Sequence, residues 1–209
     1  MSRRRASANR PLPFDVLAIG SSWGGVDMLQ RLVRQLPASW RLPIVIVQHQ
    51  HPNSGLALER ILSKATRLVV RDVEDKDRLE TGHIYIAPAN YHLLLEDDGH
   101  FSLSVEAPVK YCRPALDVTF ASLARVLQER CIGLVLTGAN DDGADGIRTI
   151  KAAGGHTLAQ SPASAEAPAM PAAAIATGAV DLVLEPAQIV PHLLQLLTDG
   201  TGDAEHSNR

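Results

Sequence analysis

Residues 18–25 of this chain, Ala18-Ile19-Gly20-Ser21-Ser22-Trp23-Gly24-Gly25, predict a junction at which a strand, a turn and a helix meet. An apolar run from Phe14 to Ile19 leads into this stretch. After it, the residues from Val26 to Val33 repeat apolar side chains at helical spacing. The glycine-rich turn therefore follows a buried strand and opens into an amphipathic helix, with Ser22 at its centre.

The turn alone leaves three interpretations open. Glycines between a strand and a helix can hold a dinucleotide phosphate, but that pattern needs a glycine where Ser22 stands. Gly20, Ser22 and Gly24 match the Gly-x-Ser-x-Gly turn, which presents a nucleophilic serine. In the third interpretation Ser22 only caps the helix that follows. The choice among these three interpretations depends on residues farther along the chain.

Composition narrows the class of protein. The 209 residues fit one large domain, and 45% hydrophobic with 21% charged residues is typical of a soluble globular protein. A net charge of −3 provides no positive field for nucleic acid or acidic lipid. No apolar run approaches the roughly 20 residues of a membrane span, and the N-terminus lacks a secretory signal. Cys112 and Cys131 have no zinc-type or disulfide-type spacing. We therefore expect a cytoplasmic protein that is not inserted in a membrane and binds no nucleic acid.

Apolar runs alternate with helical periodicity along the chain, which predicts an α/β fold with a mainly parallel, doubly wound sheet flanked by helices. A small antiparallel hairpin excursion is predicted over residues 83–105, where short strand-like segments turn at Asp97-Asp98-Gly99. We expect a disordered arm over 1–13, one domain over 14–198 and a disordered tail over 199–209. The other predicted strands are 14–19, 43–49, 68–73, 133–137, 156–159 and 181–184, and the helices are 26–33, 56–65, 118–127, 144–153, 172–176 and 187–197.

Three of the predicted strands end in residues with reactive side chains. Ser22 follows the first, His49 ends the second, and an acidic run that offers Asp141, Asp142 and Asp145 follows the strand at 133–137. Ligands of parallel sheets lie beyond the carboxyl ends of the strands. A serine needs a base to take its proton, and the base needs a carboxylate to orient it. Each residue alone suits a loop or a helix cap, but together they favour acyl-transfer catalysis.

A metal site is the alternative that His49 and His51 raise, because both side chains would leave an extended backbone on the same side. A metallohydrolase needs further ligands, and residues 52–55 include no strong one. We therefore expect no metal ion and no cofactor. The order serine, histidine, acid along the chain also argues against an α/β-hydrolase, in which the acid precedes the histidine.

These motifs resemble the catalytic domain of the CheB-type chemotaxis protein-glutamate methylesterases. The family's Gly-Ala-Ser-Thr-Gly-Gly corresponds to residues 20–25, and its Gln-His-Met-Pro corresponds to residues 48–51. Its Leu-Thr-Gly-Met-Gly-x-Asp-Gly-Ala-x-Gly corresponds to residues 136–146. Segments 82–88, 113–118 and 170–171 are also similar, so that the resemblance covers about residues 16–197.

The resemblance implies that residues 14–198 form a catalytic domain in which Ser22 is the nucleophile, His49 the base and Asp142 the orienting acid. It also places Trp23, Ala139 and Arg113 beside the oxyanion or the substrate. The implied reaction is hydrolysis of methyl esters on glutamates of a methylated chemoreceptor or receptor-like protein, often with deamidation of glutamines. The alternative is a non-catalytic regulatory or protein-binding module with the same fold.

The chain departs from the family pattern at three places. Trp23 stands where the family has threonine, Ala139-Asn140 replaces Met-Gly, and Lys110-Tyr111-Cys112 replaces more polar residues. The family commonly carries a receiver domain before the catalytic domain, and here we expect none before residue 14. Control by a separate regulatory protein or by access to substrate, and activity without a phosphodonor, are the corresponding expectations.

Overall fold

A computed structural model describes residues 12–50 and 57–199 of the chain. Seven strands form one sheet in the order β3-β4-β2-β1-β7-β8-β9, and every neighbouring pair is parallel. The predicted parallel α/β fold is therefore confirmed. The strands are β1 (Val16–Ser21), β2 (Ile44–Gln48), β3 (Val69–Asp72), β4 (His83–Ile86), β7 (Cys131–Val135), β8 (His156–Gln160) and β9 (Leu182–Leu184).

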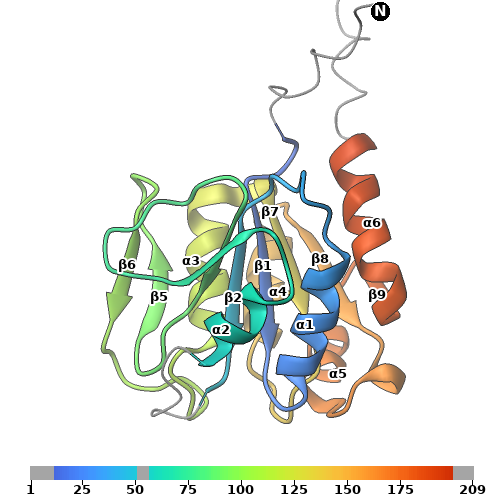
Figure 1. Ribbon diagram of the computed structural model, residues 1–209. Coiled ribbons are helices and arrows are strands. Elements are labelled where there is room, and N and C mark those ends of the chain that lie inside the picture. Colours follow the sequence, from blue (N-terminus) through green and yellow to red (C-terminus); the bar gives the residue numbers. More distant parts are fainter. Residues whose placement is uncertain (1–11, 51–56, 200–209) are drawn as a thin grey trace, which may run out of the picture.

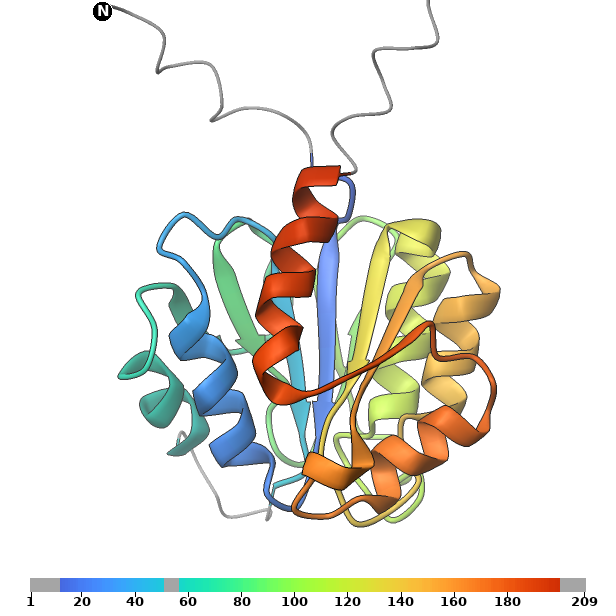
Figure 2. The same cartoon turned by 90° about the vertical axis from the view of Figure 1, so that its right-hand side faces the viewer.

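Helices cover both faces of the sheet (Figures 1 and 2). One face packs against α1 (Gly25–Gln35), α2 (Ala57–Ser63) and α6 (Pro186–Asp199), and the other against α3 (Leu116–Leu127), α4 (Ala144–Ala152) and α5 (Ala169–Ala176). Short 3-10 turns lie at Gln128–Arg130 and Pro162–Ser164. Among the described helices, none is long and apolar enough to cross a membrane.

The central strand β1 shows why both faces are apolar. Leu17 and Ile19 belong to the core on the α1 face, while Val16 and Ala18 belong to the core on the α3 face, and all four are fully buried. Side chains alternate between the two sides of a strand, so a strand covered on both sides must be apolar throughout. The near-continuous apolar run in the sequence encodes this position in the middle of the sheet.

The antiparallel excursion is smaller than predicted. Among the strands of the described residues, only β5 (His92–Leu95) and β6 (Phe101–Ser104) pair antiparallel, in a separate two-stranded sheet that packs against α3. The prediction that the strand from His83 belongs to this excursion was wrong, because β4 pairs in parallel with both β2 and β3. Ile84, Tyr85 and Ile86 are fully buried, as residues of an inner strand must be.

Several predicted boundaries also shift. β1 continues through Ser21 and α1 begins at Gly25, one residue earlier than predicted, so the turn is shorter than the sequence suggested. The residue that caps α1 is Gly24, with a φ of 74° that favours glycine, so the interpretation of Ser22 as the helix cap was wrong. Helices α3 and α5 begin two and three residues earlier than predicted, and α5 holds Pro171 in its first turn, where proline is tolerated.

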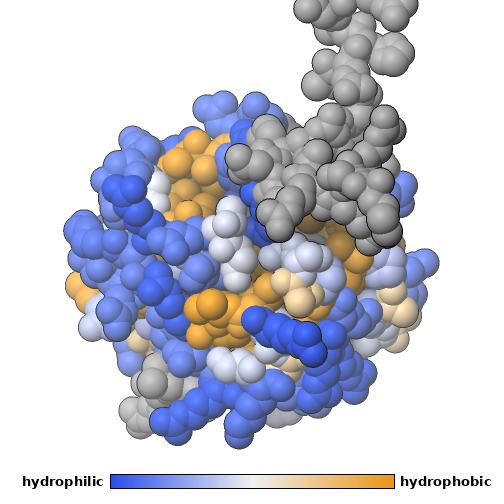
Figure 3. Space-filling view, turned by 45° about the horizontal axis from the view of Figure 1, so that its top comes forward, coloured by the Kyte–Doolittle hydropathy of each residue, from blue (hydrophilic) through white to orange (hydrophobic). Residues whose placement is uncertain are grey.

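The first and last described residues lie at the end of the molecule opposite the carboxyl ends of β1 and β2 (Figures 1 and 2). Figure 3 brings this end of the molecule forward and shows apolar residues exposed between hydrophilic ones. Leu12 and Pro13, expected to belong to a disordered arm, have defined positions here, where their carbonyl oxygens accept hydrogen bonds from Arg130. The rest of the expected arm, and the tail from residue 200, lie outside the described residues.

Candidate active site

The carboxyl ends of three neighbouring strands form the candidate site. β1 lies between β2 and β7, so the segments that follow these three strands emerge side by side. Backbone hydrogen bonds join them: the Ser22 N–H donates to the Thr137 oxygen at 2.9 Å, and the His49 N–H donates to the Ser21 oxygen at 3.0 Å. The sheet topology thus brings together segments that are far apart in the sequence, as a parallel α/β sheet is expected to do.

Gln48 fixes the spacing between the first two strand ends. Its buried side-chain amide donates to the Ser22 carbonyl at 2.9 Å, and its oxygen accepts a 2.7 Å hydrogen bond from the Ser21 hydroxyl. Gly25 leaves the room for this contact, since a Cβ there would lie 2.2 Å from the Gln48 Oε1. Packing therefore requires glycine at position 25. Gln48 in turn holds the Ser22 turn beside His49.

Asp142 lies at the bottom of the site with no exposed surface. Its Oδ2 accepts from the His49 Nε2 at 2.7 Å and from the Leu116 N–H at 2.7 Å, and its Oδ1 accepts from the Asp117 N–H at 3.0 Å. Burial alone would raise the pKa of Asp142, but these hydrogen bonds outweigh it and lower the pKa. Asp142 is therefore a carboxylate, and His49 must carry its proton on Nε2.

The N-termini of two helices converge beneath this carboxylate. The first N–H groups of α3 donate to Asp142, while Asp117, in the first turn of α3, accepts from the N–H groups of Gly143 and Gly146 at the start of α4. Burial, together with the nearby negative charge of Asp142, raises the pKa of Asp117. Helix N-termini carry partial positive charge, which explains how two acidic side chains share one interior.

The two other acidic candidates point away from the histidine. Asp141 and Asp145 are more than half exposed, and both pair with Lys110, whose ammonium also reaches Asp117 at 2.9 Å. Burial works against the charge of Lys110, but the three carboxylates outweigh it and raise its pKa. Of the three acids left open by the sequence, only Asp142 contacts His49, which agrees with the choice that the resemblance implied.

His49 lies between Asp142 and a cysteine. Its Nδ1 is 3.4 Å from the Cys112 Sγ, and within residues 12–50 and 57–199 no hydrogen bond joins it to the Ser22 hydroxyl. Burial by itself would lower the pKa of His49, but the hydrogen bonds to Asp142 and Cys112 raise it to about 9. The Asn140 amide also donates toward the same sulfur at 3.4 Å. The structure therefore places a thiol where the sequence analysis expected only a serine.

A cavity of about 290 Å³ opens beside the imidazole. It is lined by His49, Gln50, Asn90, Pro108, Tyr111, Cys112, Arg113 and Pro114. The Arg113 guanidinium is held by the carbonyl oxygens of Val105 and Glu106, so it anchors the segment that bears the cysteine. Trp23 is 67% exposed, and Ala139 is also exposed, so both lie at the surface next to the strand ends.

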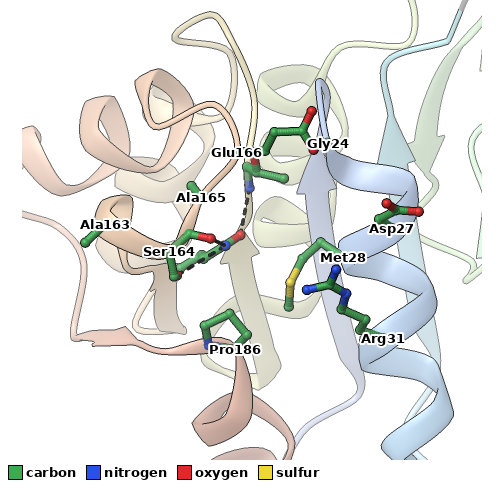
Figure 4. Close-up of a pocket in the computed structure, with 11 residues that line it drawn as sticks. Gly24, Asp27, Met28, Arg31, Ala163, Ser164, Ala165, Glu166 and Pro186 are labelled. Carbon is green, nitrogen blue, oxygen red and sulfur yellow. Dashed lines mark hydrogen bonds between the residues drawn. The ribbon is translucent and has the colours of Figure 1, made fainter.

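A second cavity, of about 240 Å³, lies on the other side of the turn, between the start of α1 and the loop before α5 (Figure 4). Glu166 lies over Gly24, and a Cβ on Gly24 would be 2.7 Å from it. Arg31 and Asp27 project from α1 toward the same space. This cavity borders the glycine turn at Gly24 and shares no lining residue with the cavity of His49.

Metal binding can be tested against the donor atoms. One ligand atom each from His49, Cys112 and Asp142 lie within 4.8 Å of one another, in a group different from the His49 and His51 pair considered from the sequence. His51 lies outside the described residues. Asp142 is already engaged, whichever oxygen it would offer, because both of its carboxylate oxygens accept backbone N–H groups.

Sequence reasoning gave Gln48 and Asp117 no role in this site, and it named Cys112 as part of a segment that departs from the family pattern but did not connect it with His49. Gln48 was detectable as a lone polar residue that closes a buried apolar strand. Asp117 and Cys112 gave no such signal, because their partners lie 26 and 63 residues away in the chain. Contacts of this kind depend on how the elements pack.

Comparisons with known proteins agree with the geometry. The CheB methylesterase family model matches residues 17–193. A putative protein-glutamate methylesterase/protein-glutamine glutaminase of Leptospira interrogans is 39% identical over 183 residues, which cover 88% of this chain and 95% of that protein. The protein-glutamate methylesterase/protein-glutamine glutaminase 2 of Anaeromyxobacter dehalogenans is 41% identical over 196 residues, 94% of this chain and 57% of that protein.

A solved structure gives the same result. The crystal structure of the Thermotoga maritima CheB methylesterase catalytic domain superimposes with a TM-score of 0.84 at 32% sequence identity. The superposition covers 88% of this chain and 98% of the Thermotoga chain. With a family model over most of its length, similar relatives and a matching fold, this chain belongs to the CheB methylesterase family.

Proposed function

We propose that this protein hydrolyses methyl esters on glutamate side chains of a chemoreceptor or receptor-like protein, and that the same site deamidates glutamines. The observation that carries the proposal is the 2.7 Å hydrogen bond from His49 to the buried Asp142. His49 follows β2, and hydrogen bonds join the end of β2 to the residues of the Ser22 turn. Relatives of this chain are named for both reactions. A buried carboxylate that orients an imidazole beside a serine is the arrangement that acyl transfer requires.

The proposed reaction uses Ser22 as nucleophile. His49 takes the hydroxyl proton at Nδ1, because its Nε2 is committed to Asp142. The Ser22 oxygen then forms a bond to the ester carbonyl carbon, and the carbonyl oxygen becomes an oxyanion. When the carbon–oxygen bond to the methoxy group breaks, His49 returns the proton and methanol leaves. Water, activated by the same imidazole, hydrolyses the acyl-enzyme.

The surroundings of the turn support binding of the oxyanion and the substrate. Ser22 lies at the positive end of α1, and backbone N–H groups at a helix start stabilise developing negative charge. No described residue accepts a hydrogen bond from the N–H of Ala139, which leaves it available as a donor. The exposed rings of Trp23 and Tyr111 offer apolar surface for a protein substrate.

Methanol release from a methylated receptor cytoplasmic fragment tests the proposal, with ammonia release from its unmodified glutamine form as the second readout. We expect methanol to be released at a rate proportional to enzyme concentration. Exhaustive chelation should leave this rate unchanged, since no step is assigned to a metal. A protein that binds the fragment but releases no methanol would instead fit the non-catalytic module, and loss of activity on chelation would show that a metal takes part.

The pKa of His49 predicts a rising pH profile. A base with a pKa of about 9 is mostly protonated at neutral pH, and only its neutral form can take the serine proton. We therefore expect kcat/KM to increase about tenfold per pH unit below pH 9 and to level off above it. A profile that is flat between pH 6 and 9 would show that the pKa of the base is not raised in the working enzyme.

The same argument predicts the effect of removing the thiol. Because the hydrogen bond from His49 to Cys112 helps to raise the histidine pKa, Cys112→Ala should move the acidic limb of the profile to lower pH. Activity at pH 7, relative to the plateau of the same variant, should rise. Cys131→Ala is the matched control, because the Cys131 side chain is buried in the core on the α3 face and makes no contact with His49. A limb that stays in place in both variants would contradict the prediction.

A further inference from the structure

The imidazole of the site has two candidate nucleophiles within the same fold, and the structure shows the thiol in contact with it. The Cys112 Sγ lies 3.4 Å from the His49 Nδ1, the nitrogen that the proposed esterase reaction needs. On its other ring nitrogen His49 is oriented by the buried carboxylate of Asp142. A cysteine, a histidine and a buried acid connected in this order form the set that activates a thiol for nucleophilic attack.

Two further observations concern the surroundings of this sulfur. The Asn140 amide donates toward the sulfur at 3.4 Å, so that a thiolate would have a second donor besides the imidazole. The cavity of about 290 Å³ is lined by Cys112 together with His49 and Tyr111, and the cysteine is only partly buried. The thiol therefore faces a space that can hold the group it would take up.

Cys131 provides the contrast within the same chain. It is fully buried in β7, and burial raises the pKa of its thiol to about 12. Thiols of that kind are inert, whereas partly exposed thiols next to a base or a cation are reactive. The two cysteines of the chain thus differ in the property that decides reactivity, and only Cys112 can reach a base.

We propose that Cys112 is a reactive thiol that takes up small disulfides by exchange and thereby closes the methylesterase site reversibly. In the reacting pair the thiol proton is already on His49, and the Cys112 thiolate attacks one sulfur of the disulfide. The new S–S bond forms as the old one breaks, and the leaving thiolate takes the proton from His49. The products are a mixed disulfide on Cys112 and one free small thiol, so the small disulfide is the oxidant and no other is needed.

The consequence for the esterase follows from the position of the sulfur. A group attached to Cys112 would occupy the cavity beside His49, next to Nδ1, the nitrogen that the proposed reaction needs. This consequence rests on the proposed function, because it matters only if Ser22 and His49 hydrolyse esters. The reactivity of the thiol itself does not depend on that function.

The test uses the full chain and 5,5′-dithiobis(2-nitrobenzoate), a disulfide whose released thiol is coloured, with a chelator present throughout. We expect one thiol to react at least about tenfold faster than a free cysteine derivative at the same pH. The fast phase should remain in Cys131→Ser, disappear in Cys112→Ser, and slow to the rate of the free thiol in His49→Gln and His49→Asn. Esterase activity should fall in step with the fast phase and return with dithiothreitol.

Each part of the inference can fail by itself. A Cys112 that reacts no faster than a free thiol, or equally fast in both histidine variants, overturns activation by His49. Wild-type protein that keeps its esterase rate after full labelling of Cys112 overturns the closure of the site. So does Cys112→Ser protein that loses the same fraction of its own starting activity under the reagent. If no ester is hydrolysed but the fast, His49-dependent phase is present, the proposed function fails while the reactive thiol is supported.

Discussion

Replacing Ser22 with alanine is expected to lower methyl ester hydrolysis by at least about 10³-fold, while the protein stays folded. Alanine removes the oxygen that would form the acyl-enzyme, and water held by His49 is a much weaker substitute. The backbone contacts of the turn do not need the hydroxyl, since the residue is held by its N–H and its carbonyl oxygen. Steady-state methanol release and a thermal unfolding midpoint for each protein measure the two halves of this prediction.

Ser21 is the matched control for Ser22. It is adjacent in the sequence, but its hydroxyl is buried and donates to Gln48. Ser21→Ala should cost about 1 kcal/mol of stability through the lost hydrogen bond and leave turnover within a few-fold of wild type. If Ser22→Ala retained near-normal turnover while Cys112→Ala lost it, the nucleophile would be the cysteine.

The double replacement of Ser22 and His49 separates a catalytic pair from two independent contributions. Residues that act as one unit lose their effect together, so the double variant should be little slower than Ser22→Ala alone. If the fold-reductions in rate of the two single variants multiplied in the double variant, His49 would contribute to the rate without acting on Ser22.

Much of the site could be predicted because a parallel sheet places the ends of neighbouring strands together. The apolar runs that end near Ser22 and His49 predicted β1 and β2, and their pairing brings Ser21 opposite Gln48. The apolar runs could not predict the order of the strands in the sheet. β4 has four residues, and so short an apolar segment does not reveal whether one or both of its faces are covered.

The contacts of His49 were harder to predict than its place at a strand end. Its partner Cys112 comes from the segment before α3, whose path is set by the hydrogen bonds of Arg113 to the carbonyl oxygens of residues 105 and 106. No local pattern encodes such a path, because it depends on side chains that meet only after the helices pack. Gln48 differs in this respect, because a polar residue at the end of a buried strand already indicates a buried partner.

The choice among the three acids also required the structure. Residues 141, 142 and 145 have the same carboxyl group, and the sequence offers no periodicity that buries one of them rather than another. Burial is decided by α3 and α4, which begin on either side of Asp142 and direct their first N–H groups into the space around it. The neighbouring Asp141 turns outward to Lys110. Asp142 is buried against His49, whereas Asp141 is exposed and pairs with Lys110. Replacing these two adjacent residues should therefore change kcat by very different factors.

Asp142→Asn is expected to lower kcat by about 10³- to 10⁴-fold, and Asp141→Asn to change it less than about threefold. The two changes are chemically identical and one residue apart. At position 142 the amide oxygen can still accept from the Leu116 or Asp117 N–H, but its NH₂ group cannot accept from His49. His49 then loses the partner that keeps its proton on Nε2 and stabilises the imidazolium formed during attack.

Folding has to be separated from catalysis at this position, because Asp142 is fully buried. The thermal midpoint of Asp142→Asn should fall, since an amide leaves at least one of its donors unpaired. The kinetic effect should nevertheless persist at temperatures where both variants are fully folded by circular dichroism. Equal losses of kcat in the two variants would show that the acid is not selected by its contact with His49. A loss confined to Asp142→Asn, with KM unchanged, would assign the effect to the reacting imidazole, because a carboxylate beneath it orients the base and contacts no substrate.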